Sequence, residues 1–300
     1  MNKHVTIIMR CKNSDWVIAE ALSALFSQHF KDFELLVVDS GSTDRTLEFV
    51  SAYPCRLIEI APEHYYPGKV LNEAIAHCNS DLIVFLNSDS VMLSPNSLGN
   101  LVSAFDDENL VAAYGRQLAR PEAETWVKRD YAVSFPEHAQ DKPSWITLSF
   151  PLAAIRQDAL KQHPFYTDAW ASEDTEWGEW ARQMGHKIAY VPTATTMHSH
   201  NYSLKEIYGR RFVEGEADCF IFKKRPNIYE RLRELVTMTA NDMIFHVRMH
   251  DWRSIPSILP KRLVYQWAYF QGLRLGTKRI SDKCFDTSLG QAVVLDSTVK

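Results

Sequence analysis

Short runs of apolar and β-branched residues, each followed by a polar cluster, recur through the first third of the chain. They occupy residues 5–9, 34–38, 56–60 and 82–86. Between them, apolar residues recur at helical spacing, as at Val17, Ala21 and Leu25. The order strand, helix, strand, repeated at short spacing, predicts an α/β fold with a doubly wound, mostly parallel sheet.

The fourth run, residues 82–86, is apolar without interruption, which predicts a strand buried on both faces. It stops at Asn87, Ser88 and Asp89. Ligands of open α/β sheets bind just outside the carboxyl ends of the strands, and Asp89 offers a hard oxygen donor there. The alternative is that Asp89 closes a turn or caps the helix expected at residues 95–105.

Polar residues also follow the first two strands, and they are candidates for helix caps. Asn13 or Ser14 is placed to cap the first helix, and Ser42 or Thr43 to cap the second. A third helix is expected at residues 68–77.

The chain changes character after residue 110. Strands are expected at 111–115, 146–155 and 187–191, whereas residues 120–143 lose their apolar period and predict a loop, which is either a flexible surface loop or part of a substrate site. Residues 204–280 have a helical pattern, which Pro256 and Pro260 are expected to break. We therefore predict a first domain at 1–203, a helical segment at 204–280 and a flexible tail at 281–300.

Charge is unevenly distributed along the 300 residues. The net charge is −4, but residues 201–280 hold 15 Lys and Arg against 8 Asp and Glu, so the remainder carries a balance of −11. An acidic body with a basic C-terminal segment suggests a surface that faces something anionic.

Five cysteines without a short shared spacing exclude the usual zinc and redox motifs and predict free thiols in a reducing cytosol. Residues 1–4 lead into a strand without the apolar stretch of a signal peptide, and no run reaches the ~20 apolar residues of a spanning helix. We expect a cytoplasmic protein.

Four motifs in register resemble family 2 glycosyltransferases, which are inverting enzymes with the GT-A fold. Leu-Leu-Val-Val-Asp-Ser-Gly-Ser-Thr-Asp at 35–44 is similar to the first family signature, and the segments 7–13, 66–72 and 85–89 follow the family's order. The wording His-Ser-His-Asn-Tyr-Ser at 198–203 is most similar to the bacterial rhamnosyltransferase-type branch. The resemblance covers about residues 5–204.

The resemblance assigns roles to residues at the strand ends. It implies that Asp39 accepts a hydrogen bond from the nucleobase and that Arg10 and Lys69 contact the diphosphate. Asp89 matches the last residue of the family's Asp-x-Asp metal motif, whereas Asn87 replaces its first aspartate and contributes no charge. The alternatives are a helix cap for Asp39 and solvated surface charge for Arg10 and Lys69.

Two further motifs complete the implied site. Glu173 and Asp174 follow Ser172, a candidate helix cap, and match the family's Glu-Asp pair, in which the aspartate is the general base and Glu173 orients the acceptor or the base. The alternative is that the pair only stabilises the start of a helix. His198, with His200 in reserve, matches the histidine that completes a Mg²⁺ or Mn²⁺ site with Asp89.

We therefore expect a glycosyltransferase that moves a sugar from a nucleotide-diphosphate donor to a hydroxyl of a glycan or lipid-linked glycan, with no role for nucleic acid. The donor implied by resemblance is thymidine-diphosphate rhamnose, followed by uridine-diphosphate sugars. A catalytically silent nucleotide-sugar-binding protein is the alternative that Asn87 favours. A nucleotidyltransferase or dinucleotide oxidoreductase is disfavoured, because no glycine-rich loop follows the first strand.

Basic residues lie among aromatic residues between Trp252 and Ile280. This composition predicts peripheral contact with an anionic membrane, which places the protein at the inner face of the cell membrane. The alternative is a set of helices packed on the catalytic body with basic outer faces.

Overall fold

The computed structural model describes residues 4–284 and 286–298 and divides into two compact units. The first unit comprises Met1–Arg120, Tyr131–Phe165 and Asp174–Ser199. The second comprises Pro121–Asp130, Tyr166–Glu173 and His200–Lys300. The second unit therefore combines the C-terminal part of the chain with two short segments from its middle, Pro121–Asp130 and Tyr166–Glu173.

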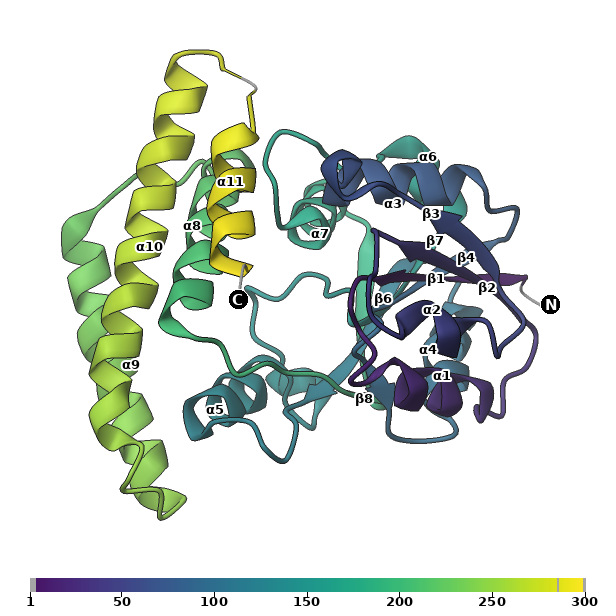
Figure 1. Cartoon of the computed structure of the whole chain (residues 1–300), viewed down its shortest axis with the longest axis horizontal. Coiled ribbons are helices and arrows are strands. Elements are labelled where there is room, and N and C mark those ends of the chain that lie inside the picture. Colours follow the sequence, from purple (N-terminus) through teal and green to yellow (C-terminus); the bar gives the residue numbers. More distant parts are fainter. Residues whose placement is uncertain (1–3, 285, 299–300) are drawn as a thin grey trace. The chain divides into compact units, whose positions relative to one another are not determined.

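An eight-stranded sheet forms the centre of the first unit (Figure 1). Its strands are β1 (Val5–Cys11), β2 (Phe33–Asp39), β3 (Arg56–Glu59), β4 (Leu82–Leu86), β5 (Val91–Met92), β6 (Leu110–Leu118), β7 (Leu152–Arg156) and β8 (Lys187–Met197). The order is β3-β2-β1-β4-β7-β6-β8-β5, in which β7 and β5 run antiparallel to their neighbours. The predicted doubly wound, mostly parallel sheet is confirmed.

Helices cover both faces of this sheet (Figure 1). They are α1 (Ile18–Phe26), α2 (Thr46–Val50) and α4 (Ser97–Ser103) on one face, and α3 (Pro67–Ala76), α6 (Gln157–Gln162) and α7 (Glu173–Gln183) on the other. Each face of the sheet has its own hydrophobic core, and alternate residues of β1 belong to different cores. Ile7 and Met9 lie in the core that contains α1, whereas Ile8 lies in the core that contains α3. Burial on both faces explains the unbroken apolar runs of the sequence. Three 3₁₀ turns complete the unit, η1 (Pro62–His64), η2 (Ala104–Asp106) and η3 (Ala139–Asp141).

The expected helix caps have another role. Helix α1 begins at Ile18 and α2 at Thr46, beyond the predicted capping residues. The side chains of Val17 and Arg45, which precede the two helices, make no cap, and the Thr46 N–H donates to the Asp44 carboxylate at 2.9 Å. Instead, the Asn13 carboxamide accepts a hydrogen bond from the Thr43 backbone N–H at 2.8 Å. The capping prediction was wrong because these polar side chains join the loops after β1 and β2 to each other.

A second difference concerns residues 120–143, which contain helix α5 (Thr125–Ser134) instead of a continuous loop. Its sequence lacks an apolar stripe because its buried positions are mixed: Trp126 and Val127 are buried, and Asp130 pairs with Arg262 at 2.9 Å. The expected strand at 146–155 is also shorter than predicted, since β7 begins only at Leu152.

Long helices make up most of the second unit (Figure 1). They are α8 (Leu204–Ile221), α9 (Ile228–Arg248), α10 (Ile255–Ser281) and α11 (Ser288–Thr298). They lie side by side in the order α9, α10, α8, α11. Gly272 lets α10 approach α8 closely, because a Cβ atom there would lie 1.9 Å from the carbonyl oxygen of Phe212.

Two predictions for this segment were wrong. Helix α10 continues through Pro260, because Pro256 sits in the first turn and Pro260, one turn later, removes a single helical hydrogen bond. Residues 288–298, expected to be part of a flexible tail, form α11. Helix α11 packs on α8, where Gly290 faces Glu216. Its sequence has little amphipathic pattern, so the helix could not be predicted from periodicity.

All five cysteines have free thiols. Among the described residues, no helix combines the length and the apolar composition that crossing a bilayer requires.

Candidate active site

Strand pairing brings Asp89 and His198 together within the first unit. The short strand β5 pairs antiparallel with the end of β8, with Val91 opposite Met197. Asp89, two residues before Val91, therefore lies beside His198, the residue after Met197. The Asp89 Oδ1 atom is 3.6 Å from His198 Nε2, and the two side chains are 17% and 12% exposed.

Arg120 fixes the turn that carries Asp89. Its guanidinium donates a hydrogen bond to the Asp89 carbonyl oxygen at 2.7 Å, and its centre lies 4.9 Å from the Trp16 ring centroid. The Arg120 backbone N–H is held by the Ser199 hydroxyl at 2.9 Å. One buried arginine thus connects the loops that follow β1, β4, β6 and β8.

Tyr131 of α5 fixes the ring of His198. The Tyr131 hydroxyl lies 3.0 Å from His198 Nδ1, so the other ring nitrogen, Nε2, faces Asp89. The His198 backbone N–H donates to the Leu118 carbonyl oxygen at 3.0 Å, which completes the β6–β8 ladder. These two hydrogen bonds therefore fix both the ring orientation and the backbone position of His198.

Sequence reasoning missed Arg120 and Tyr131 for identifiable reasons. The strand expected at 111–115 extends to Leu118, so Arg120 follows a strand end directly, the same signal that identified Asp89. Tyr131 lies on a helix where a loop was expected.

The neighbours of Asp89 in its turn are also held in place. Ser88 is buried, and its hydroxyl shares a hydrogen bond of 2.9 Å with the Ser14 hydroxyl after β1. Asn87 is half-buried, and its carbonyl oxygen accepts the Ser90 N–H that closes the turn. The structure thus contains the turn that the sequence offered as an alternative, and this turn presents Asp89 to His198.

Asp39, at the end of β2, is 1% exposed. Its carboxylate accepts backbone hydrogen bonds from Gly41 at 2.9 Å and Ser42 at 2.8 Å, and it also accepts bonds from the Ser42 hydroxyl and the Cys11 thiol. Gly41 has the left-handed φ of +81° that this tight turn requires. Burial, reinforced by the neighbouring Asp39 charge, raises the pKa of the Cys11 thiol far above its ordinary value, so Cys11 is a neutral donor.

The two predicted cations lie on different elements. Arg10 is half-buried in β1, where it pairs with Val38 of β2. Lys69 is exposed in the first turn of α3, with its ammonium group 5.2 Å from the Tyr66 ring centroid.

Asp174 lies in the first turn of α7, and its Oδ2 accepts a long hydrogen bond of 3.4 Å from the Phe150 backbone N–H. Leu152 pairs with Leu86, the last residue of β4, in an antiparallel ladder. Phe150, two residues before Leu152, therefore lies beyond the carboxyl end of β4. Asp174 is thus at the same edge of the sheet as Asp89.

Glu173 and His200 belong to the second unit. Glu173 is buried, and the His200 ring stacks on Tyr202 with centroids 5.2 Å apart. Ser172, the expected cap of α7, has φ of +69°, which differs from the extended conformation typical of an N-cap.

The pair Asp89 and His198 fits a divalent cation chemically. Their candidate ligand atoms lie within 4.8 Å of each other. A carboxylate together with an imidazole suits Mn²⁺, and it also suits Mg²⁺ when water molecules supply further ligands. The Tyr131 contact leaves His198 Nε2 facing the carboxylate, as ligation requires.

Comparison with known proteins identifies the family. The model for "Glycosyl transferase family 2" matches residues 6–164, more than half of the chain. The chain is 32% identical over 200 residues to the O-antigen chain rhamnosyltransferase WbaN of Salmonella anatum, which covers 61% of this chain and 61% of that protein. It is 27% identical over 223 residues to the O-antigen chain rhamnosyltransferase RfbN of Salmonella typhimurium, covering 70% and 71%. The first match thus spans less than two thirds of its relative.

Among solved structures, the mannosyltransferase PcManGT from Pyrobaculum calidifontis, in complex with GDP-Man and Mn²⁺, resembles the chain with a TM-score of 0.56 and 19% identity. The likeness covers 100% of this chain and 87% of that one and concerns the fold. The mixed α/β architecture with its helical C-terminal region is that of the GT-A glycosyltransferases. With its family match over residues 6–164, the chain belongs to glycosyl transferase family 2.

Proposed function

We propose that this protein transfers a sugar from a nucleotide-diphosphate donor to a hydroxyl group of a glycan or lipid-linked glycan. The observation that carries the proposal is the placement of Asp89, His198 and Asp174 along one edge of the sheet in the first unit. A carboxylate–imidazole pair at this edge suits a diphosphate with its cation, and a second carboxylate suits an acceptor hydroxyl. The catalytic part is assigned to residues 1–203.

Asp89 and His198 hold Mg²⁺ or Mn²⁺ in this proposal, with His200 as the alternative imidazole. The cation supplies positive charge next to the diphosphate, which stabilises the leaving group. Asn87 adds no charge and serves through its amide, by binding a ribose hydroxyl or a metal-bound water. Mn²⁺ and a nucleotide sugar are bound together by PcManGT, which has the same fold.

Arg10, Lys69 and Asp39 bind the nucleotide. The two cations contact the diphosphate. Asp39 accepts the nucleobase imide N–H, and because four donors already surround its carboxylate, the Ser42 hydroxyl or the Cys11 thiol has to turn away to make room.

Asp174 is the general base. It takes the proton of the acceptor hydroxyl as that oxygen attacks the anomeric carbon from the side opposite the diphosphate, which inverts the configuration. A carboxylate is a weak base for an alcohol, so the proton moves late, as the C–O bond forms. Glu173 orients the acceptor or the base.

The names of two relatives support a choice of sugar donor. Both O-antigen relatives are rhamnosyltransferases, which favours thymidine-diphosphate rhamnose as donor, with uridine-diphosphate sugars next, and a role in polysaccharide biosynthesis. A lipid-linked acceptor favours a cytoplasmic protein at the inner face of the cell membrane. Consistent with such contact, Trp252 and Trp267 are 58% and 51% exposed, although Tyr269 of the same segment is buried.

Exchange of Asp174 for asparagine tests the proposed base. We expect Asp174→Asn to abolish sugar transfer while nucleotide-sugar binding, measured by calorimetry, stays nearly unchanged, because the amide keeps the shape but accepts no proton. Full turnover by the folded variant would assign the base role to Glu173. A wild-type protein that binds donor but transfers to no acceptor would favour the alternative, a catalytically silent nucleotide-sugar-binding protein.

A further inference from the structure

Helix α9 has the reverse of the usual polarity. Its buried face carries Arg231, Asp242 and His246, which are 5%, 0% and 1% exposed. Its exposed face carries apolar side chains, among them Leu232 and Val236 at 51% and 67% exposure. A helix on the surface of a soluble protein ordinarily turns its apolar stripe inward.

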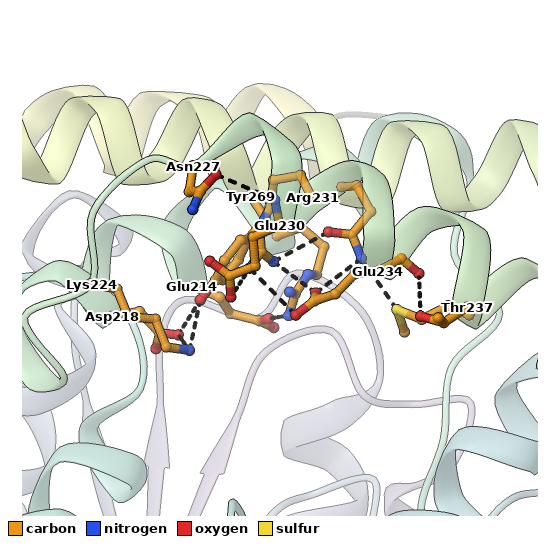
Figure 2. Close-up of polar contacts among 12 residues, drawn as sticks. Glu214, Asp218, Lys224, Asn227, Glu230, Arg231, Glu234, Thr237 and Tyr269 are labelled. Carbon is orange, nitrogen blue, oxygen red and sulfur yellow. Dashed lines mark hydrogen bonds and ion pairs between the residues drawn. The ribbon is translucent and has the colours of Figure 1, made fainter.

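Ion pairs account for the polar buried face. Arg231 pairs with Glu230 at 2.7 Å and with Glu234 at 2.8 Å (Figure 2). It also donates a hydrogen bond to Gln266 of α10. Asp242 accepts the Arg262 Nε–H at 2.6 Å. Glu230 and Glu234 lie on α9 itself, whereas the Arg231–Gln266 hydrogen bond and the Asp242–Arg262 ion pair join α9 to α10. Polar contacts therefore hold the inner face of α9.

The apolar residues of α9 and α10 form one surface. The pairs Asp242–Arg262 and Arg231–Gln266 show that the two helices run antiparallel, because the lower-numbered residue of α9 contacts the higher-numbered residue of α10. In two antiparallel right-handed helices, the residue after each contact residue turns to the same side of the pair. Met243 and Leu263, which follow Asp242 and Arg262, therefore share one side.

Other exposed apolar residues continue this side at spacings of four or seven residues, which is one or two helical turns. We call the set the outer face; it consists of Leu232, Val236, Met243, Val247, Leu259, Leu263 and Trp267. All seven side chains are exposed. A contiguous apolar patch of this kind marks an interaction surface rather than scattered surface residues.

Basic side chains lie at both ends of the outer face. At one end, the α9–α10 connection carries Arg253; at the other, basic residues lie in the chain entering α9 and in the second half of α10. Exposed basic residues at the two ends include Lys223, Arg225, Arg253, Arg274 and Lys278. The buried arginines of the segment, such as Arg262 and Arg279, are neutralised by carboxylates and do not contribute.

We propose that the outer face lies on an anionic lipid bilayer, a surface assignment that rests on the membrane association proposed above. Apolar side chains enter the headgroup boundary, and the basic residues at both ends contact lipid phosphates. A second copy of the chain fits less well, because both ends are positive and any two-fold pairing of outer faces brings like charges together.

Sedimentation of the full chain with lipid vesicles tests the assignment. We expect binding to phosphatidylcholine vesicles that contain phosphatidylglycerol, a decrease with added salt, and little binding to pure phosphatidylcholine. Val236→Glu should lose most of the bound fraction, because it places a carboxylate in the apolar surface. Asn241→Glu is the matched control: it adds the same charge to an exposed position of α9, on the side away from the outer face, and should bind like wild type.

Equal binding by Val236→Glu and wild type would overturn the assignment, as would no binding of wild type to anionic vesicles at low salt. Dissociation of an oligomer by Val236→Glu, seen by ultracentrifugation while vesicle binding persists, would assign the face to a second copy. Nucleotide-sugar binding by the same variants separates the two proposals. If no nucleotide sugar stabilises any of them but vesicle binding follows the pattern above, the proposed activity fails and the surface assignment stands.

Discussion

At the scale of single residues, the proposed cation site depends on a tyrosine that acts through His198. The Tyr131 hydroxyl holds His198 Nδ1 at 3.0 Å. Loss of such an outer partner typically lowers metal affinity about 10- to 100-fold. We expect Tyr131→Phe to weaken Mn²⁺ binding within this range, as measured by electron paramagnetic resonance of free Mn²⁺, while the fold stays intact.

Tyr190→Phe is the matched control for this prediction. It removes a half-buried hydroxyl of the same unit that donates to Pro136 and does not contact His198. Unchanged Mn²⁺ affinity in Tyr131→Phe, or an equal loss in Tyr190→Phe, would mean that the Tyr131 hydroxyl does not position the histidine.

The sequence identified those site residues that belong to a recognisable local motif. Asp89 could be predicted from its position after an unbroken apolar strand, whereas His198 was indicated by its match to the family's histidine. The resemblance implied that the two residues share a cation. No local pattern shows their closeness, because it depends on the pairing of β5 with β8 across about a hundred residues of chain. Arg120 has no local signal unless the end of β6 is placed correctly.

At the scale of elements, close packing of α8 on α10 requires glycine. A Cβ atom on Gly272 would lie 1.9 Å from the Phe212 carbonyl oxygen, which is backbone and cannot turn away. We expect Gly272→Ala to lower the free energy of unfolding by about 1–3 kcal/mol, the typical cost of overpacking, in urea denaturation.

Gly99→Ala in α4 provides the contrast. Its added Cβ would meet only the Phe30 Cβ at 3.8 Å, an ordinary contact. Because alanine favours helix over glycine, this change should stabilise the protein by up to about 1 kcal/mol. Equal effects of the two substitutions would contradict the close-packing account.

Hydrophobic periodicity predicted an element well where its buried positions are all apolar, and poorly where they include both apolar and charged residues. The strands buried on both faces, such as β1 and β4, were predicted within a residue or two. Helix α5 was missed because its inward positions include both the buried Trp126 and the partly buried, ion-paired Asp130. The same mixture in α9 puts charged residues inside and apolar residues outside.

At the scale of the whole molecule, the chain combines a nucleotide-binding type of sheet with a helical unit held by buried ion pairs. The basic excess of residues 201–280 had suggested an anionic partner. Part of that excess is internal, since Arg231, Arg262 and Arg279 are buried beside carboxylates. Sequence alone could not separate internal from surface charge, because the partners of Arg262 lie in two different segments of the chain.

The central claim is that the first unit binds a nucleotide-diphosphate sugar with a cation held by Asp89 and His198. Thermal unfolding of wild type and Asp89→Ala with thymidine-diphosphate rhamnose and uridine-diphosphate sugars, with Mn²⁺ or with chelator, tests it most directly. A donor present at 100 times its Kd should stabilise wild type by about 2.7 kcal/mol. We expect this with Mn²⁺ only, and nearly none of it in Asp89→Ala. Equal stabilisation of wild type in Mn²⁺ and in chelator would contradict the claim.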